Sequence, residues 1–280
     1  MRFRELKKLL KKYNLRPSRR LGQNFLVDEK VLRKIIEAAE LSKNDIVLEI
    51  GPGIGNLTVK LAKRVKKVVA VEKDQRMIEI LKETLKDFKN VKIIKADILK
   101  FSPKIYNLKS KIYKVVANIP YYLTSPLIRK FVETVEVKPQ LLVLMVQKEV
   151  AQRICTKPPD MSILAVSVQF YAKAEIISFV SKKSFWPQPK VDSAIIKIIP
   201  RKSALPIGVN PLLFFKVVRA GFSQPRKQLA NNFSKKLGID KIKVREWLLK
   251  NKIQPTQRAE TLNLEDWINL TKSLNPVNLI

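Results

Sequence analysis

The tetrapeptide Asn118-Ile119-Pro120-Tyr121 contains the most specific chemistry in the sequence. The side-chain oxygen of Asn118 and the backbone carbonyl of Ile119 are adjacent acceptors for the N–H groups of an amine, and Pro120 restricts the backbone after them. Tyr121 supplies a ring that can stack on a nucleobase. Because the exocyclic nitrogen of adenine delocalises its lone pair into the ring, two such acceptors would favour the pyramidal geometry needed for attack on a methyl donor. The alternative is a turn asparagine beside a partly buried tyrosine.

A second set of residues follows successive β-type segments and suits a nucleoside. The turn Gly51-Pro52-Gly53-Ile54-Gly55 comes directly after Ile46–Ile50, and a helical pattern begins at about Asn56. Glu72 ends the second segment, where an acid can accept from ribose hydroxyls, and Asp97 ends the third, where it can accept from an adenine amino group. We therefore predict that Gly51, Glu72 and Asp97 bind a cofactor that contains adenosine. Each acid alone could instead cap the helix that follows it.

The same turn distinguishes between two cofactor classes. Asn56 occupies the position of the third glycine in the dinucleotide fingerprint, and this departure disfavours NAD. These residues alone leave a dinucleotide and S-adenosylmethionine both open, and the methyl group of the latter is already activated. The sequence contains no histidine, which excludes Ser-His-Asp and Cys-His catalysis. A methyl donor that requires no general base fits this composition.

These residues must be positioned by a sheet, and the segments up to Pro200 predict one. Short β-branched runs alternate with stretches whose apolar residues recur every three or four positions. This order predicts an α/β fold with a mostly parallel, doubly wound, seven-stranded sheet, in which ligands bind at the carboxyl ends of the strands. The expected strands are Ile46–Ile50, Val68–Glu72, Val91–Lys95, Lys114–Ala117, Leu141–Val146, Glu175–Val180 and Ala194–Ile199.

The charge distribution indicates a polyanionic partner. Lys and Arg number 56 against 24 Asp and Glu, for a formal net charge of +32. Nine basic residues and one acid, Glu5, lie within residues 1–20, and nine basic residues and no acid lie between Ser193 and Ile239. Such clusters suit a surface that follows an RNA backbone. A Lys-rich composition with a solvated surface is the alternative.

After Pro200 only helical periodicity remains, which predicts a small all-helical C-terminal domain. We divide the chain into a basic N-terminal arm (1–20), a catalytic domain that binds the cofactor (21–200) and a helical RNA-binding domain (201–280). In the arm, Leu6, Leu9, Leu10 and Tyr13 would share one face of a short helix, although its charge makes fraying an equal expectation. The expected C-terminal helices lie near Leu212–Ala220, Arg226–Leu237, Lys243–Leu249 and Leu264–Leu274.

The composition also argues against a disulfide, a zinc site and a membrane span. A single cysteine, Cys155, cannot form an internal disulfide, and without histidine the usual zinc ligand sets are missing, so we expect no metal. No apolar run approaches the ~20 residues of a membrane span, and the N-terminus lacks the apolar centre of a secretory signal. We expect a cytoplasmic monomer with no membrane partner.

Taken together, the motifs resemble the small-subunit ribosomal RNA adenine dimethyltransferases, the KsgA family, over nearly the whole chain. Besides the glycine turn and Asn118–Tyr121, the resemblance rests on Leu21–Leu26, Phe185–Ser193, Gln224–Leu229 and Arg258–Leu262, in this order. Pro225 departs from the family, which often has a basic residue at that position. The resemblance implies a Rossmann-like class I methyltransferase fold with S-adenosylmethionine as the methyl donor.

The resemblance also implies roles for individual residues. Asn24 and Leu26 would close over the cofactor, and Gly51, Glu72, Asp97 and Asn118 would contact it. Tyr121 and Phe185 would sandwich a flipped adenine, and the cations expected to contact RNA are Arg219, Arg226 and Lys227. The implied substrate is a pair of adjacent adenosines in the hairpin near the 3′ end of 16S RNA, in the immature small ribosomal subunit, each methylated twice at N6.

Three other functions deserve comparison with this one. An erythromycin-resistance methyltransferase would share the fold and the tetrapeptide but modify large-subunit RNA, and the Arg226-Lys227 segment and Arg258–Leu262 argue against it. An RNA-binding assembly factor with a vestigial site is opposed by the intact cofactor and tetrapeptide residues. A dehydrogenase is disfavoured by the glycine turn.

Overall fold

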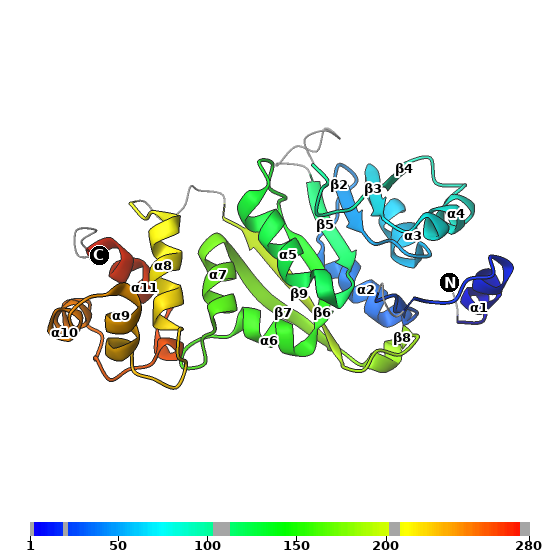
Figure 1. Cartoon of the computed structure of the whole chain (residues 1–280). Helices are drawn as coiled ribbons and strands as arrows, with labels where there is room; N and C mark the ends of the chain where they lie inside the picture. The colour runs from blue at the N-terminus through cyan, green and yellow to red at the C-terminus, as the bar shows by residue number, and fades with distance from the viewer. Residues whose placement is uncertain (1–2, 19–21, 103–112, 202–207, 275–280) are drawn as a thin grey trace. The chain divides into compact units, whose positions relative to one another are not determined.

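The computed structural model describes residues 3–18, 22–102, 113–201 and 208–274 (Figure 1). The chain forms two compact units, of which the first comprises residues 1–151 and 174–200 and the second comprises residues 152–173 and 201–280. The basic N-terminal residues therefore belong to the first unit instead of forming a separate arm. Residues 152–173, which were expected in the catalytic domain, group with the C-terminal helices.

A seven-stranded sheet in the order β4-β3-β2-β5-β6-β9-β7 forms the centre of the first unit. Strands β2 to β6 pair in parallel in the ladders β4-β3, β3-β2, β2-β5 and β5-β6, and β9 runs antiparallel to β6. The predicted α/β fold with a mostly parallel seven-stranded sheet is confirmed. The strands are β2 (Ile46–Ile50), β3 (Lys67–Glu72), β4 (Val91–Lys95), β5 (Tyr113–Asn118), β6 (Leu142–Gln147), β7 (Ala172–Val180) and β9 (Ser193–Pro200).

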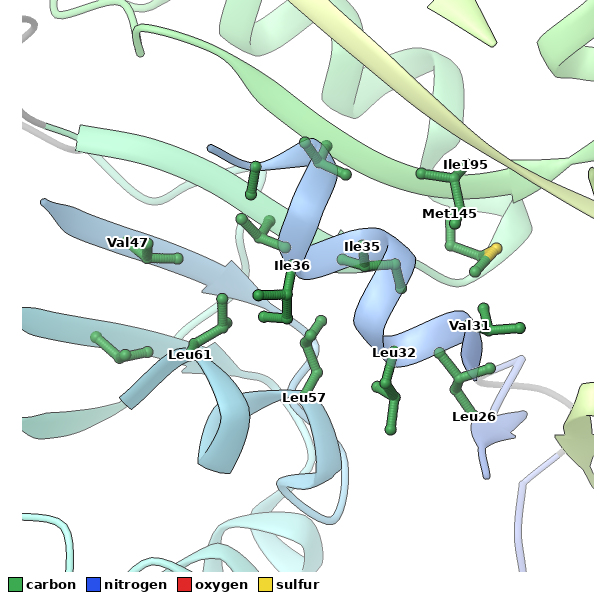
Figure 2. Packing of buried hydrophobic residues seen from close by; sticks show 14 of the residues in the cluster. Leu26, Val31, Leu32, Ile35, Ile36, Val47, Leu57, Leu61, Met145 and Ile195 are labelled. Atoms are coloured by element: carbon green, nitrogen blue, oxygen red, sulfur yellow. The ribbon is translucent and has the colours of Figure 1, made fainter. Parts of the chain in front are cut away.

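Helices cover both faces of this sheet because the strands are apolar on both sides. Figure 2 shows one face, where Leu32, Ile35 and Ile36 of α2 pack near Leu57 of α3 and Val47 of β2. The alternate residues of β2, β3 and β5 are equally buried on the opposite face, among them Leu48, Val69 and Val115. The helices of this unit are α1 (Phe3–Lys12), α2 (Glu29–Ala38), α3 (Asn56–Ala62), α4 (Gln75–Thr84) and α5 (Thr124–Arg129), and α6 (Lys148–Cys155) crosses the limit between the units.

Helix α1 is formed and packed, although the sequence left a frayed arm equally open. Leu6 and Leu10 are buried in a cluster with Phe25, Ile54, Met77 and Ile80. Tyr13, the residue after the helix, donates from its hydroxyl to Glu83 on α4. The ammonium of Lys12, the last residue of the helix, lies 2.7 Å from the same carboxylate. Burial of the leucine face therefore holds the helix in spite of its charge.

A two-stranded antiparallel sheet lies apart from the main sheet. Strand β1 (Phe25–Leu26) pairs with β8 (Phe185–Trp186), with Leu26 opposite Phe185. Two-residue strands have no periodicity, so the sequence pattern did not predict this pairing. It joins two segments that the family resemblance assigns to different ligands, the cofactor and the target base.

Apart from the second unit's share of β7, the regular secondary structure described in this unit is helical, as Figure 1 shows. Trp267, Phe214 and Phe233 are fully buried at its centre. The predicted helix start near Arg226 is wrong, because the Asn232 amide donates to the carbonyls of Gly221 and Gln224 and holds residues 222–228 in a turn. The helices are α7 (Ile163–Tyr171), α8 (Pro211–Gly221), α9 (Leu229–Leu237), α10 (Lys241–Lys250) and α11 (Leu264–Ser273).

Candidate active site

A cavity of about 620 Å³ lies at the carboxyl ends of the parallel strands in the first unit. The chain runs from β2 outward through β3 and β4, then crosses to β5 on the other side of β2. The loops after β2 and β5 therefore diverge and leave a crevice, which is where open α/β sheets bind ligands. Gly51, Glu72, Asp97 and Asn118 stand at or just beyond the ends of β2, β3, β4 and β5, and all four line the cavity.

The structure brings the predicted cofactor and catalytic residues together around this one cavity. The predicted RNA-binding residues belong to the second unit, where Arg219 is exposed on α8 and Arg226 and Lys227 are exposed in the turn before α9. The predicted residues that line the cavity are Asn24, Leu26, Gly51, Glu72, Asp97, Asn118, Ile119, Pro120, Tyr121 and Phe185.

Glycine is required in the turn after β2 because another element lies against it. Gly53 has a φ of +56°, in the left-handed region, and a Cβ atom there would lie 3.2 Å from the Phe25 ring. Strand β1 can therefore approach the turn closely, with Asn24 and Leu26 at the cavity. The Asn56 amide donates to the Leu26 carbonyl at 3.0 Å and holds the strand there.

The Glu72 carboxylate is held rigidly by the backbone. Its Oε1 accepts from the N–H groups of Lys73 (2.8 Å) and Asp74 (2.9 Å), and its Oε2 lies 3.4 Å from the N–H of Gly53. Burial raises the pKa of Glu72, and the three backbone donors oppose that effect. A fixed carboxylate whose Oε2 makes only a long hydrogen bond fits a ribose hydroxyl pair.

Asp97 forms an ion pair that the sequence did not predict. Lys73 Nζ lies 2.9 Å from Asp97 Oδ2, and the N–H of Leu99 donates to Oδ1 at 3.0 Å. The hydrogen bond from Lys73 lowers the pKa of Asp97, so the carboxylate is ionised at neutral pH. Lys73 also lines the cavity, and its position directly after Glu72 was the only signal in the sequence.

Asn118 is oriented by a hydrogen bond to the residue just before β1. Its Nδ2 donates to the Asn24 carbonyl at 3.2 Å. Since this bond uses the donor side of the amide, Oδ1 is the side that can accept from a ligand. The observed orientation therefore fits a role as hydrogen-bond acceptor for an amine.

The two aromatic residues of the predicted base site differ in burial. Phe185 is 4% exposed, and Tyr121 is partly buried, with its hydroxyl 2.8 Å from Ser193 Oγ. Burial raises the pKa of Tyr121, so the phenol stays protonated at neutral pH. The Tyr121 ring is thus anchored at its polar end.

Glu49 is a site residue that the sequence interpretation missed. It is 1% exposed, lines the cavity, and has no hydrogen-bond partner for Oε2 among the described residues. Burial raises the pKa of Glu49 to about 8. The Asn56 Oδ1 beside the same cavity is likewise buried without a partner in the described part of the chain. Buried acceptors in this condition are typical of ligand sites, and an acid inside an apolar strand was the available signal.

The described residues contain no group of three or more Cys, Asp or Glu side chains with a geometry that could hold a metal ion. Within the same residues, no helix combines the length and apolar character needed to cross a membrane.

Known proteins resemble this chain in both sequence and structure. Residues 14–276 match the family model for ribosomal RNA adenine dimethylase. Ribosomal RNA small subunit methyltransferase A of Dehalococcoides mccartyi (strain ATCC BAA-2266 / KCTC 15142 / 195) is 44% identical over 263 residues, which cover 94% of this chain and 90% of that protein. The dimethyladenosine transferase from Plasmodium falciparum is 32% identical with a TM-score of 0.73, over 88% of this chain and 95% of that one. The 23S rRNA methyltransferase ErmE is 27% identical with a TM-score of 0.73, over 90% and 99%.

The fold, the cavity at the carboxyl ends of the strands and these similarities define a Rossmann-like methyltransferase that uses S-adenosylmethionine. The dehydrogenase alternative is therefore wrong. The chain belongs to the ribosomal RNA adenine dimethylase family, as the sequence resemblance implied.

Proposed function

We propose that this protein dimethylates the N6 atoms of two adjacent adenosines in the 3′-terminal hairpin of 16S RNA, within the immature small ribosomal subunit. The observation that carries the proposal is the Asn118 amide, whose donor side is bound to Asn24 and whose acceptor side remains for a ligand of the cavity. The choice of small-subunit RNA is supported by the 44% identity to a small-subunit methyltransferase, compared with 27% to a 23S enzyme.

The cavity residues suit the adenosine portion of the methyl donor. The fixed Glu72 carboxylate would accept from the ribose hydroxyls, and Asp97 would accept from the adenine amino group. The backbone at Gly51 would lie against the ligand, with Asn24 and Leu26 covering it. When bound, S-adenosylmethionine supplies a methyl group that is electrophilic because it is attached to a sulfonium sulfur.

The residues after β5 would then activate and hold the target base. Asn118 Oδ1 and the Ile119 carbonyl accept from the two amine hydrogens and draw the nitrogen out of conjugation with the ring. Pro120 maintains the backbone between these acceptors and Tyr121. Tyr121 and Phe185 stack on the flipped base, which excludes water from its faces. The amine proton passes to solvent after the transfer, so no histidine is needed.

The proposal also includes the residues that bind RNA, the oligomeric state and the cellular location of the protein. Arg219, Arg226 and Lys227 are exposed in the second unit and would bind phosphates of the RNA. We infer that the protein acts in the cytoplasm, because its proposed substrate is the assembling ribosomal subunit, and that it acts as a monomer.

Labelled methyl transfer to immature small subunits is the direct test. The RNA would be digested by nucleases and its nucleosides identified by mass. We expect N6,N6-dimethyladenosine at two adjacent positions near the 3′ end. Methylation confined to large-subunit RNA would refute the substrate while retaining the chemistry.

Replacing Tyr121 with alanine should lower kcat by roughly 5- to 150-fold, because base-aromatic stacking contributes about 1–3 kcal/mol per base. The Kd for S-adenosylmethionine should change less than about twofold, since the ring is assigned to the adenine of RNA. Tyr121→Phe, which keeps the ring, should lose less activity than Tyr121→Ala. A large rise in the cofactor Kd of Tyr121→Ala would contradict the assignment.

Affinity for the RNA should fall steeply with salt, at a slope of roughly −0.7 on logarithmic axes for each phosphate contact on single strands. Replacing Arg226 and Lys227 with glutamine should make this slope shallower by about 1.4 if both bind phosphates. Filter binding between 50 and 300 mM salt would measure it. An unchanged slope would show that these two cations do not contact RNA.

A further inference from the structure

We propose that the outer face of α1 is a phosphate-binding surface for the RNA strand that leads to the target adenosine. This inference rests on the proposed function and adds a second contact with the same substrate. Arg4, Lys7, Lys8 and Lys11 are exposed and follow the spacing i, i+3, i+4 and i+7. Residues with that spacing share one face of a helix. The four cations therefore form one stripe, which we call the α1 stripe.

The stripe is carried by a helix that the structure holds in place. Leu6 and Leu10 on the inner side of α1 pack against Phe25, Ile54 and Met77, and these three residues also line the cavity. The α1 stripe is thus separated from residues of the active site by about the diameter of helix α1. A strand whose adenosine enters the cavity would pass close to it.

Repulsion among the four cations of the α1 stripe favours the binding of a polyanion to it. Like charges three or four positions apart in a helix destabilise it by about 0.2–0.5 kcal/mol per pair. The only acid of α1 is Glu5, and Lys12, which pairs with Glu83, is not part of the stripe. RNA phosphates would neutralise the four cations together. A membrane is a poorer partner, because the leucine face that would enter lipid is already buried in protein.

An aromatic contact connects the stripe to the base site. The Lys7 ammonium lies 4.6 Å from the centroid of the Phe3 ring, and Phe3 contacts Trp186 edge to face at 5.9 Å. Trp186 follows Phe185, the proposed wall of the base site, in β8. Cations interleaved with aromatic rings are typical of surfaces that bind single-stranded RNA.

The test compares two triple variants that remove the same charge. Lys7, Lys8 and Lys11 are replaced together with glutamine, which preserves helix propensity. The control replaces Lys63, Lys66 and Lys89 with glutamine. These three exposed lysines precede β3 and β4, at the amino ends of strands whose carboxyl ends face the cavity. Each variant is assayed for RNA affinity, for kcat at saturating RNA and for the Kd of S-adenosylmethionine.

We expect the α1 variant to weaken RNA binding at least tenfold near 100 mM salt and to reduce the salt slope by about 2, for three lost contacts. Its kcat and cofactor Kd should match the wild type, and the control should bind RNA nearly normally. Equal losses in both variants, or none in the α1 variant, would overturn the proposal. Failure of the proposed function would appear differently, as no methyl transfer to small-subunit RNA by the wild type.

A second inference comes from a separate contact. We infer that Ser193 is a positioning residue for Tyr121, because its Oγ lies 2.8 Å from the Tyr121 hydroxyl and the serine is fully buried. Its neighbour Asp192 accepts from the N–H of Lys182, at the start of the turn that leads to Phe185. The start of β9 therefore holds both aromatic walls of the base site.

A double-mutant cycle tests this role. Ser193→Ala and Tyr121→Phe each remove one side of the hydrogen bond, so each should lower kcat about three- to tenfold, with the cofactor Kd unchanged. The double variant should be no slower than the slower single variant, since the bond can be lost only once. Multiplicative losses, or losses confined to cofactor binding, would refute the coupling between the two residues.

Discussion

Asn118→Ala is expected to lower kcat for methyl transfer by about 10²- to 10³-fold, the loss typical of removing one preorganised hydrogen-bonding group from a transition state. Asn118 lines the cavity, and because the donor side of its amide is bound to the Asn24 carbonyl, its acceptor side remains for a ligand. In the proposed mechanism, removing it would leave the amine conjugated with the adenine ring and therefore a poor nucleophile. Single-turnover kinetics at saturating RNA and cofactor would measure this step directly.

The same substitution also removes the hydrogen bond that ties Asn118 to Asn24. Asn118→Asp separates the two effects, because it loses the donor but keeps an acceptor oxygen. We expect this variant to retain more activity than Asn118→Ala. If the two variants are equally slow, or if the alanine variant is impaired only in cofactor binding, the acceptor role of Asn118 is refuted.

The stability of the cofactor-free protein is expected to depend on pH through Glu49. Burial raises the pKa of this carboxyl from an ordinary value of 4.5 to about 8. Between those two values the folded protein holds a proton that the unfolded chain releases. The contribution of Glu49 to the free energy of unfolding is therefore complete below pH 4.5, falls as pH rises toward 8 and is constant above it, with a total change on the order of 5 kcal/mol.

Glu49→Gln should remove this dependence, because glutamine stays neutral at every pH. Urea unfolding should show nearly equal stabilities of variant and wild type near pH 4.5 and a variant more stable by several kcal/mol at pH 8.5. Glu37→Gln, at an exposed position on α2, is the control for loss of a carboxylate. Parallel profiles for Glu49→Gln and the wild type would show that Glu49 is ionised in the folded protein.

These predictions concern residues that the sequence revealed to different degrees. Asn118, Glu72 and Asp97 could be predicted because each ends a strand or lies within two residues of its end, and the carboxyl ends of parallel strands meet at one edge of the sheet. Glu49 lies two residues before Gly51 in the same motif, yet its importance depends on complete burial. Burial follows from what packs over a strand, and a strand pattern alone does not specify that.

The chemistry, the strand order along the chain and the cofactor class were determined by the sequence itself, since they depend on local periodicity and on residue types at fixed spacings. The tertiary structure alone decided the contacts between distant segments: Lys73 with Asp97, Tyr121 with Ser193, and β1 with β8. It also decided that α1 packs against the cavity and that α9 begins at Leu229 instead of Arg226. Each of these depends on burial or hydrogen bonds between residues far apart in the chain, and such pairings leave no periodic signal in the sequence.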